Sequence, residues 1–119
     1  MRSATFQHFG VPTSVKQDGE VFIEGLGVHV TDPEAHPYQI EFLRFEPDSW
    51  MPEIIQTQSH AAYRVDSLEE AMEGKTVVVE PFEASETLRL AFILDGDALL
   101  ELQEIPAQDE AGSQGSNAL

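Results

Sequence analysis

Cysteine is absent from the 119 residues of the chain. Its absence excludes disulfide bonds, thiolate nucleophiles and zinc sites built from thiolates, and it fits a reducing compartment. Basic residues are scarce as well, since six lysines and arginines stand against 22 acidic residues and give a formal charge of −16. Nucleic acids and anionic membranes are recognised through cationic patches, so neither is expected as a partner.

Long apolar runs are also lacking. No stretch of the sequence reaches the roughly 20 consecutive apolar residues that a membrane helix needs, and the first residues, MRSAT, do not form the apolar segment of a signal peptide. We therefore expect a soluble, cytoplasmic protein. An apolar fraction of 41% is ordinary for a globular chain, and the length favours one domain.

The second half of the chain carries the clearer signals of secondary structure. Its pattern predicts a strand, a short helix and three further strands, at 59–66, 67–74, 75–80, 87–94 and 98–104. Both ends of the helix are marked, because Ser67 and Glu70 form a capping box and Gly74 suits the left-handed position after the last turn. A turn is expected over 81–85, and Asp95-Gly96 is typical of a hairpin.

The first half predicts a similar order of elements without a clear helix. Strands are expected at 5–12 and 38–45, and residues 20–31 form two strands or one bent strand, because Gly25 and Gly27 interrupt them. The two halves therefore suggest a degenerate internal repeat. The polar tail, 105–119, is rich in small residues and is expected to be disordered.

Histidine and glutamate fall at matching places in the two halves. His8 and His60 lie in the first strand of each half, whereas Glu41 and Glu101 lie between apolar neighbours in the last strand. Alternation puts each glutamate on the face opposite those neighbours, which is either solvent or a cavity. In a cavity the carboxylate needs a partner such as a divalent cation. His29 and His36 have no matching positions and are expected to be structural or surface residues.

Two imidazoles and two carboxylates suit a divalent transition metal better than calcium or magnesium. Zinc, nickel, cobalt, iron and manganese all accept this ligand set, so the residues do not choose among them. Open coordination positions would give Lewis-acid chemistry. The alternative interpretation treats each histidine as structural and each glutamate as lying on a solvated face.

Several segments resemble the vicinal oxygen chelate superfamily, which includes glyoxalase I, the bleomycin-resistance proteins and the extradiol dioxygenases. The resemblance extends over most of residues 5–104 and is more specific between 60 and 102. It is carried by the segments HAAYRVDSLEEA (60–71), VEP (79–81), LAFILDGDALLEL (90–102), FQHFGVP (6–12) and IEF (40–42).

This resemblance implies an α+β fold in which two βαβββ modules form a curved, partly open barrel. One domain, 1–104, would contain module one at about 5–47 and module two at about 59–104. Module one would be shortened, since 13–19 leaves little room for its helix. Metal-using members place ligands on the first and last strands of each module, which here are His8, Glu41, His60 and Glu101. Family dimers are common, so a homodimer is expected.

The function that this resemblance implies is that of a glyoxalase-like, metal-dependent lyase or isomerase acting on a small carbonyl or vicinal-oxygen substrate. Glu41 or Glu101 would act as the general base. Arg64 shares a strand face with His60 and is expected to bind a substrate carboxylate, or else to form a surface ion pair.

Two other functions stay open. One is a non-enzymatic protein of the bleomycin-resistance type, which binds a small molecule in a groove lined by aromatic residues. The candidates for that lining are Phe9, Phe42, Phe45, Trp50 and Phe92. The other is a domain whose metal site has decayed.

Overall fold

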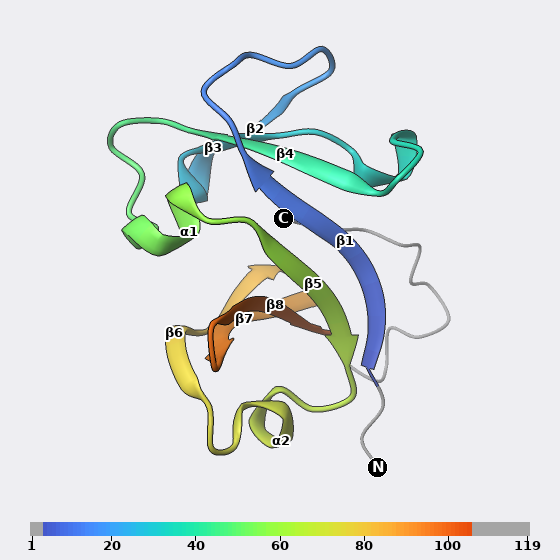
Figure 1. The fold of residues 1–119 in the computed structure, drawn as a ribbon, viewed down its shortest axis with the longest axis vertical. Coiled ribbons are helices and arrows are strands. Elements are labelled where there is room, and N and C mark those ends of the chain that lie inside the picture. Colours follow the sequence, from blue (N-terminus) through green and yellow to red (C-terminus); the bar gives the residue numbers. More distant parts are fainter. Residues whose placement is uncertain (1–3, 106–119) are drawn as a thin grey trace. The chain divides into compact units, whose positions relative to one another are not determined.

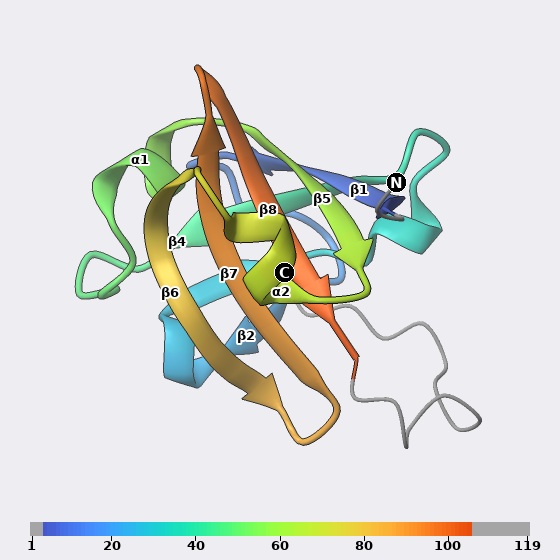
Figure 2. The same cartoon turned by 90° about the horizontal axis from the view of Figure 1, so that it is seen from below.

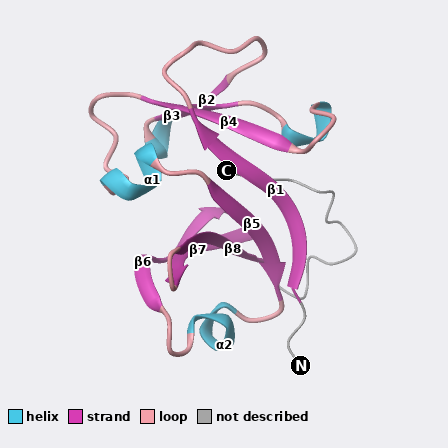
Figure 3. Cartoon of the chain, viewed as in Figure 1, coloured by secondary structure: helices cyan, strands magenta, loops and turns pink. Residues whose placement is uncertain are grey.

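The computed structural model describes residues 4–105, which form mostly strands with two short α-helices (Figure 1, Figure 3). The described chain divides into two compact units. The N-terminal unit comprises residues 8–60, and the C-terminal unit comprises 4–7 together with 61–105. Two strands cross these bounds, and each is described below with the unit that contains most of its residues. The disorder expected for 105–119 lies outside the described residues from Pro106 onward. None of the helices in the described part is long and apolar enough to cross a membrane.

The C-terminal unit has the predicted order of strand, helix and three strands. Its elements are β5 (His60–Val65), α2 (Leu68–Met72), β6 (Thr76–Ser85), β7 (Leu88–Asp95) and β8 (Ala98–Glu104). In the sheet the strands follow the order β5-β8-β7-β6. The first strand, β5, runs parallel to β8, and the other neighbours are antiparallel. Figure 2 shows β6 and β7 as a curved pair of strands.

Helix α2 covers the apolar core of this unit. Leu68 is fully buried in a cluster with Val65, Ala91, Ile93 and Leu102. Both predicted helix ends are confirmed. The Ser67 hydroxyl accepts a hydrogen bond from the Glu70 amide at 3.2 Å, and Gly74 has a φ of 76° just after the helix.

The turn predicted over 81–85 is wrong. Strand β6 continues through Pro81 to Ser85, with shifts of register against β7 at Val77/Val79, Val79/Phe82 and Glu83/Ser85. Proline lacks the amide hydrogen of a regular ladder, but it is tolerated at bulges and in strands at the end of a sheet. Because β6 is the last strand in the sheet order, the proline does not end it.

The N-terminal unit contains four strands and little helix. Its elements are β1 (Ala4–Pro12), β2 (Val21–Ile23), the 3₁₀ turn η1 (Glu24–Leu26), β3 (Val28–Val30), the 3₁₀ turn η2 (Pro33–Ala35), β4 (Ile40–Phe45) and α1 (Glu53–Thr57). The strand order is β2-β3-β4-β1, with β1 parallel to β4. Residues 20–31 therefore contain two antiparallel strands, which are connected by η1 and by Gly27 with a φ of 66°.

These elements agree with an α+β chain dominated by curled sheet. Residues 13–20, between β1 and β2, contain no helix, as expected for a shortened first module. Helix α1 was not predicted, and its Ile55 is 1% exposed. The pairing of two modules into one barrel, with boundaries near 5–47 and 59–104, stays a prediction.

Candidate metal centre

His8 and Glu41 meet on the buried face of the N-terminal unit. The parallel register of β1 and β4 places Gly10 opposite Glu41, and alternation puts His8 on the same face as Gly10. Both side chains are 1% exposed, and His8 Nε2 lies 3.2 Å from Glu41 Oε1. Phe9, on the other face of β1, is 48% exposed. In β1 the histidine side chain is therefore buried and the phenylalanine side chain is exposed.

His60 lies next to this pair. Its side chain is 3% exposed, and its ring centroid lies 6.1 Å from that of His8. Gly10 makes room for the ring, because a Cβ at Gly10 would overlap the ring atoms of His60. This requirement could not be predicted from local signals, since Gly10 lies within a strand and has neither a turn nor a positive φ.

Glu101 is held in β8 of the C-terminal unit by a neighbouring amide. It is 0% exposed, and it lies opposite Ala62 in β5. Gln103, also 0% exposed, donates a hydrogen bond from Nε2 to Glu101 Oε2 at 3.0 Å. Gln103 was not predicted as a site residue. The signal for it was its place two residues after Glu101, which puts both side chains on one strand face.

Each buried glutamate faces a small residue that follows a histidine by two positions. Gly10 lies opposite Glu41 and follows His8, while Ala62 lies opposite Glu101 and follows His60. The internal repeat is therefore visible as a His-x-small pattern in the first strand of each half.

Three buried residues, His8, His60 and Glu101, form a group that could hold a metal ion. Each offers one ligand atom, and these atoms lie within 4.8 Å of one another. Glu41 is connected to the group through its contact with His8. Two imidazoles with carboxylate oxygen are a ligand set for first-row transition metals. Burial adds to the fit, because a positive charge nearby stabilises a carboxylate that is removed from water.

Arg64, the predicted substrate-binding residue, lies half-buried in β5. Its Nη2 donates a hydrogen bond to Gln103 Oε1 at 3.1 Å, and its Nε is buried without a hydrogen-bond partner among the described residues. Burial lowers the pKa of this guanidinium from its ordinary value. The surface ion pair considered for Arg64 is not found in the described part of the chain.

The remaining histidines do not join this group. His29 Nε2 lies 2.6 Å from Glu46 Oε2 on a partly exposed face, and His36 Nδ1 accepts a hydrogen bond from the Tyr38 amide at 3.0 Å. Each therefore has a structural partner outside the group. A polar cavity of about 340 Å³ next to His29 is lined in part by Lys16.

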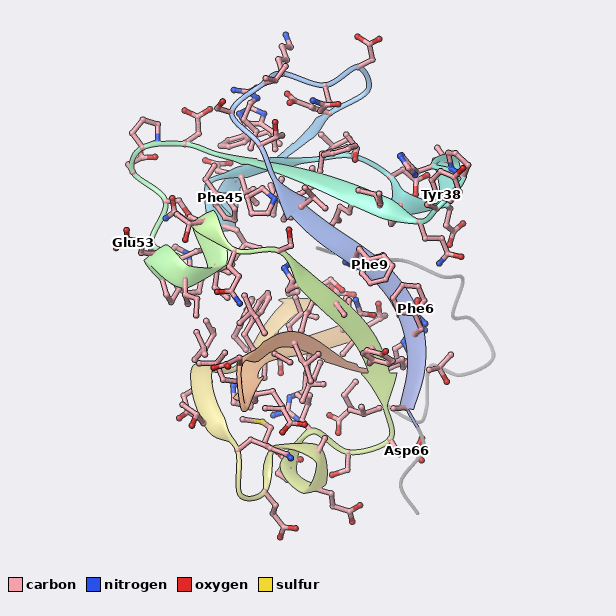
Figure 4. The ribbon with its side chains drawn as sticks, viewed as in Figure 1. Phe6, Phe9, Tyr38, Phe45, Glu53 and Asp66 are labelled. Atoms are coloured by element: carbon pink, nitrogen blue, oxygen red, sulfur yellow. The ribbon has the colours of Figure 1, made fainter. Side chains whose placement is uncertain are left out.

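The aromatic residues considered for a binding groove differ widely in exposure. Phe92 is 0% exposed and Trp50 is 53% exposed. The Trp50 ring nitrogen donates a hydrogen bond to the carbonyl of Gly25 at 2.8 Å. Figure 4 shows Phe45 near one end of β4 and Tyr38 near the other. These residues do not mark one common lining.

The fold and the site define a mostly-sheet α+β protein with a candidate histidine–glutamate metal centre. The chain is similar to the crystal structure of a hypothetical protein, BH1468, from Bacillus halodurans C-125. That similarity has a TM-score of 0.65 at 21% sequence identity and covers 97% of this chain and 99% of that chain. At this identity the likeness shows the fold alone. No protein-family model and no curated protein matches the chain, so membership of the vicinal oxygen chelate superfamily stays an interpretation.

Proposed function

We propose that this protein is a glyoxalase-like, metal-dependent lyase or isomerase acting on a small carbonyl or vicinal-oxygen substrate. One observation supports the proposal above all. His8, His60 and Glu101 are buried and offer ligand atoms within 4.8 Å of one another. Buried histidines and acids that gather around one point are typical of functional sites.

His8, His60, Glu41 and Glu101 are the proposed ligands of a divalent transition metal. When bound, the metal would supply Lewis-acid chemistry, polarising a carbonyl oxygen of the substrate. Each imidazole would contribute one ring nitrogen to the metal. Glu101 accepts a hydrogen bond on Oε2 from the Gln103 amide, which would hold the carboxylate in place beside the metal.

Glu41 is the proposed general base. Its Oε1 lies 3.2 Å from His8 Nε2, so the carboxylate stands beside the ligand group. Glu101 is anchored by Gln103 and is better suited to stay on the metal than to move. A carboxylate next to a polarised carbonyl can remove a proton from the adjacent carbon and return it at another position. Burial of both acids excludes water, which would otherwise compete for that proton.

Metal analysis of the purified protein tests the ligand assignment. After the purified protein is incubated with a first-row transition metal and the excess is removed, we expect about one equivalent of bound metal. We expect His60→Ala to bind no metal under the same conditions. His36→Ala is the matched control, because His36 lies in a loop and bonds only to local residues. Unchanged metal content in His60→Ala would refute the assignment.

Proton exchange tests the reaction class. The metal-loaded protein is incubated in D₂O with a panel of α-hydroxy and α-oxo carbonyl compounds, and deuterium at the carbon next to the carbonyl is followed by NMR. Glu41→Gln removes a proposed ligand as well as the base, so it should bind the metal more weakly through His8, His60 and Glu101 and should lose exchange even when the metal is saturating. Ligand binding by metal-free protein without any exchange would instead favour a non-enzymatic binding protein. A homodimer and a cytoplasmic location remain further predictions.

A further inference from the structure

Three arginines in the strands of the described chain differ in how their charge is balanced. Arg44 in β4 donates two hydrogen bonds to Glu20, from Nε at 2.8 Å and from Nη2 at 2.7 Å. Arg89 in β7 donates to Glu104 from Nη1 at 2.7 Å. Arg64 donates only to the neutral amide of Gln103. In the described residues Arg64 is thus the strand arginine that has no carboxylate partner.

The lack of an acidic partner is unusual in this chain. Acidic residues number 22 against six basic ones, so carboxylates are abundant. Arg64 is half-buried, and taking a guanidinium out of water without a counter-charge is costly. Carboxylates are abundant in this chain, yet Arg64 contacts the neutral amide of Gln103. Its positive charge is therefore available to an anion that binds there.

Gln103 has its orientation fixed by two charged neighbours. Its Oε1 accepts from Arg64 Nη2 at 3.1 Å, while its Nε2 donates to Glu101 Oε2 at 3.0 Å. Reversing the amide would turn its NH₂ group toward the guanidinium and its oxygen toward the carboxylate, which is unfavourable at both ends. Arg64 and Glu101 are therefore linked across one face of β5 and β8 by a single buried side chain.

We propose that Arg64 and Gln103 form an anion-binding subsite that accepts the carboxylate of a small hydroxy or oxo acid. The Arg64 Nε has no other hydrogen-bond partner among the described residues. With a second guanidinium nitrogen it offers the fork that binds a carboxylate through two hydrogen bonds. This assignment names the substrate class for the proposed function and rests on that function for its catalytic meaning, but anion binding itself requires no metal.

The test uses metal-free protein and two probes that differ in one group. Lactate carries a carboxylate, and lactamide carries a neutral amide on the same hydroxyl framework. Binding is followed in ¹H–¹⁵N spectra through the Arg64 Nε–Hε signal, which is assigned by its loss in Arg64→Lys. We expect lactate to shift this signal and lactamide to leave it in place. Inorganic phosphate should bind more weakly than lactate.

Two variants distinguish recognition of the carboxylate by Arg64 from a general effect of positive charge in the unit. Arg64→Gln should weaken lactate binding at least tenfold, whereas Arg89→Gln removes the same charge from the same unit and should leave the affinity within twofold. If Arg64→Gln does not fold, Arg64→Lys carries the test. It keeps the charge but loses the fork, so it should bind lactate several-fold more weakly than the wild type.

Three results would overturn the subsite: equal lactate affinity in the wild type and the folded Arg64 variant, equal affinity for lactate and lactamide, or tighter binding of phosphate. Failure of metal binding would refute the proposed function only. Lactate recognition by Arg64 in metal-free protein would stand in that case, so the two failures can be told apart.

Discussion

The two units have the same order of strands, but different groups cover their sheets. In the N-terminal unit the first strand, β1, lies parallel to the last, β4, and in the C-terminal unit β5 lies parallel to β8 in the same way. Helix α2 covers one face of the C-terminal sheet. The N-terminal unit has no helix between β1 and β2 in its described residues.

Polar pairing takes the place of the helix on the corresponding strands of the N-terminal unit. Phe22, His29 and Arg44 form a row across β2, β3 and β4. Glu46 contacts His29, and Glu20 contacts Arg44. Both units nevertheless bury a glutamate of the closing strand opposite a small residue of the first strand. The parallel pair of strands, rather than the helix, therefore determines where the acids lie.

The largest expected effect concerns α2, the helix of the C-terminal unit that has no counterpart between β1 and β2 in the described residues. Leu68→Ala removes a fully buried side chain from the α2 cluster and should lower the free energy of unfolding by about 2–5 kcal/mol. Val21→Ala in β2 is the control, since Val21 is 63% exposed, and it should cost less than about 0.5 kcal/mol. Urea unfolding measures both. Equal effects would show that α2 does not cover the core of its unit.

The next prediction concerns the small residues opposite the glutamates. Gly10→Ala gives β1 the residue that β5 already has at Ala62, but its Cβ would overlap the His60 ring. Because the ring must move, we expect metal affinity to fall by roughly 10- to 100-fold while all proposed ligands remain.

Isothermal titration with zinc measures this fall. The control is Gly25→Ala, because a Cβ there meets nothing within 4 Å. An affinity for Gly10→Ala equal to that of the wild type would mean that the position of the His60 ring does not matter for the metal, and the N-terminal half of the proposed centre would be refuted.

A smaller effect is expected from the amide that holds Glu101. Gln103→Leu keeps the volume of the side chain and removes the hydrogen bond to Oε2. Loss of one such supporting bond should weaken metal binding by about tenfold, with little change in fold measured by circular dichroism. Gln58→Leu, at an exposed position after α1, should leave the affinity unchanged. If Gln103→Leu bound the metal as tightly as the wild type, Glu101 would not need the Gln103 hydrogen bond to serve as a ligand.

Much of this architecture could be predicted because its signals are local. Ser67, Glu70 and Gly74 mark α2 within one turn at each end, and the apolar runs of β5, β7 and β8 are bounded by turn residues. The matched placement of His8, Glu41, His60 and Glu101 pointed to a ligand set, and all four side chains are buried. Burial of the glutamates excludes the alternative of a solvated strand face.

What could not be predicted depends on neighbours distant in the chain. Pro81 stays in β6 because of its place in the sheet order, which no local pattern reveals. Gly10 matters because of the His60 ring, and Gln103 matters because it lies between Arg64 and Glu101. Each of these roles arises from strand register, so each becomes visible only when the pairing is known.

The smallest effect concerns the polar pairing that replaces a helix in the N-terminal unit. The two hydrogen bonds from Arg44, and a third from the Gln17 amide, lower the pKa of Glu20 from its ordinary value of 4.5 to about 2. Because the folded pKa is depressed, Glu20 stabilises the fold above pH 4.5 and loses this contribution as the pH falls toward 2. Urea unfolding of the wild type and Glu20→Gln should differ at pH 7 and converge near pH 2, whereas Glu86→Gln, at an exposed turn, should match the wild type throughout. If the difference in free energy of unfolding between the two proteins did not change with pH, Glu20 would act through packing. The view that an ion pair in the N-terminal unit replaces the helix of the C-terminal unit would then be wrong.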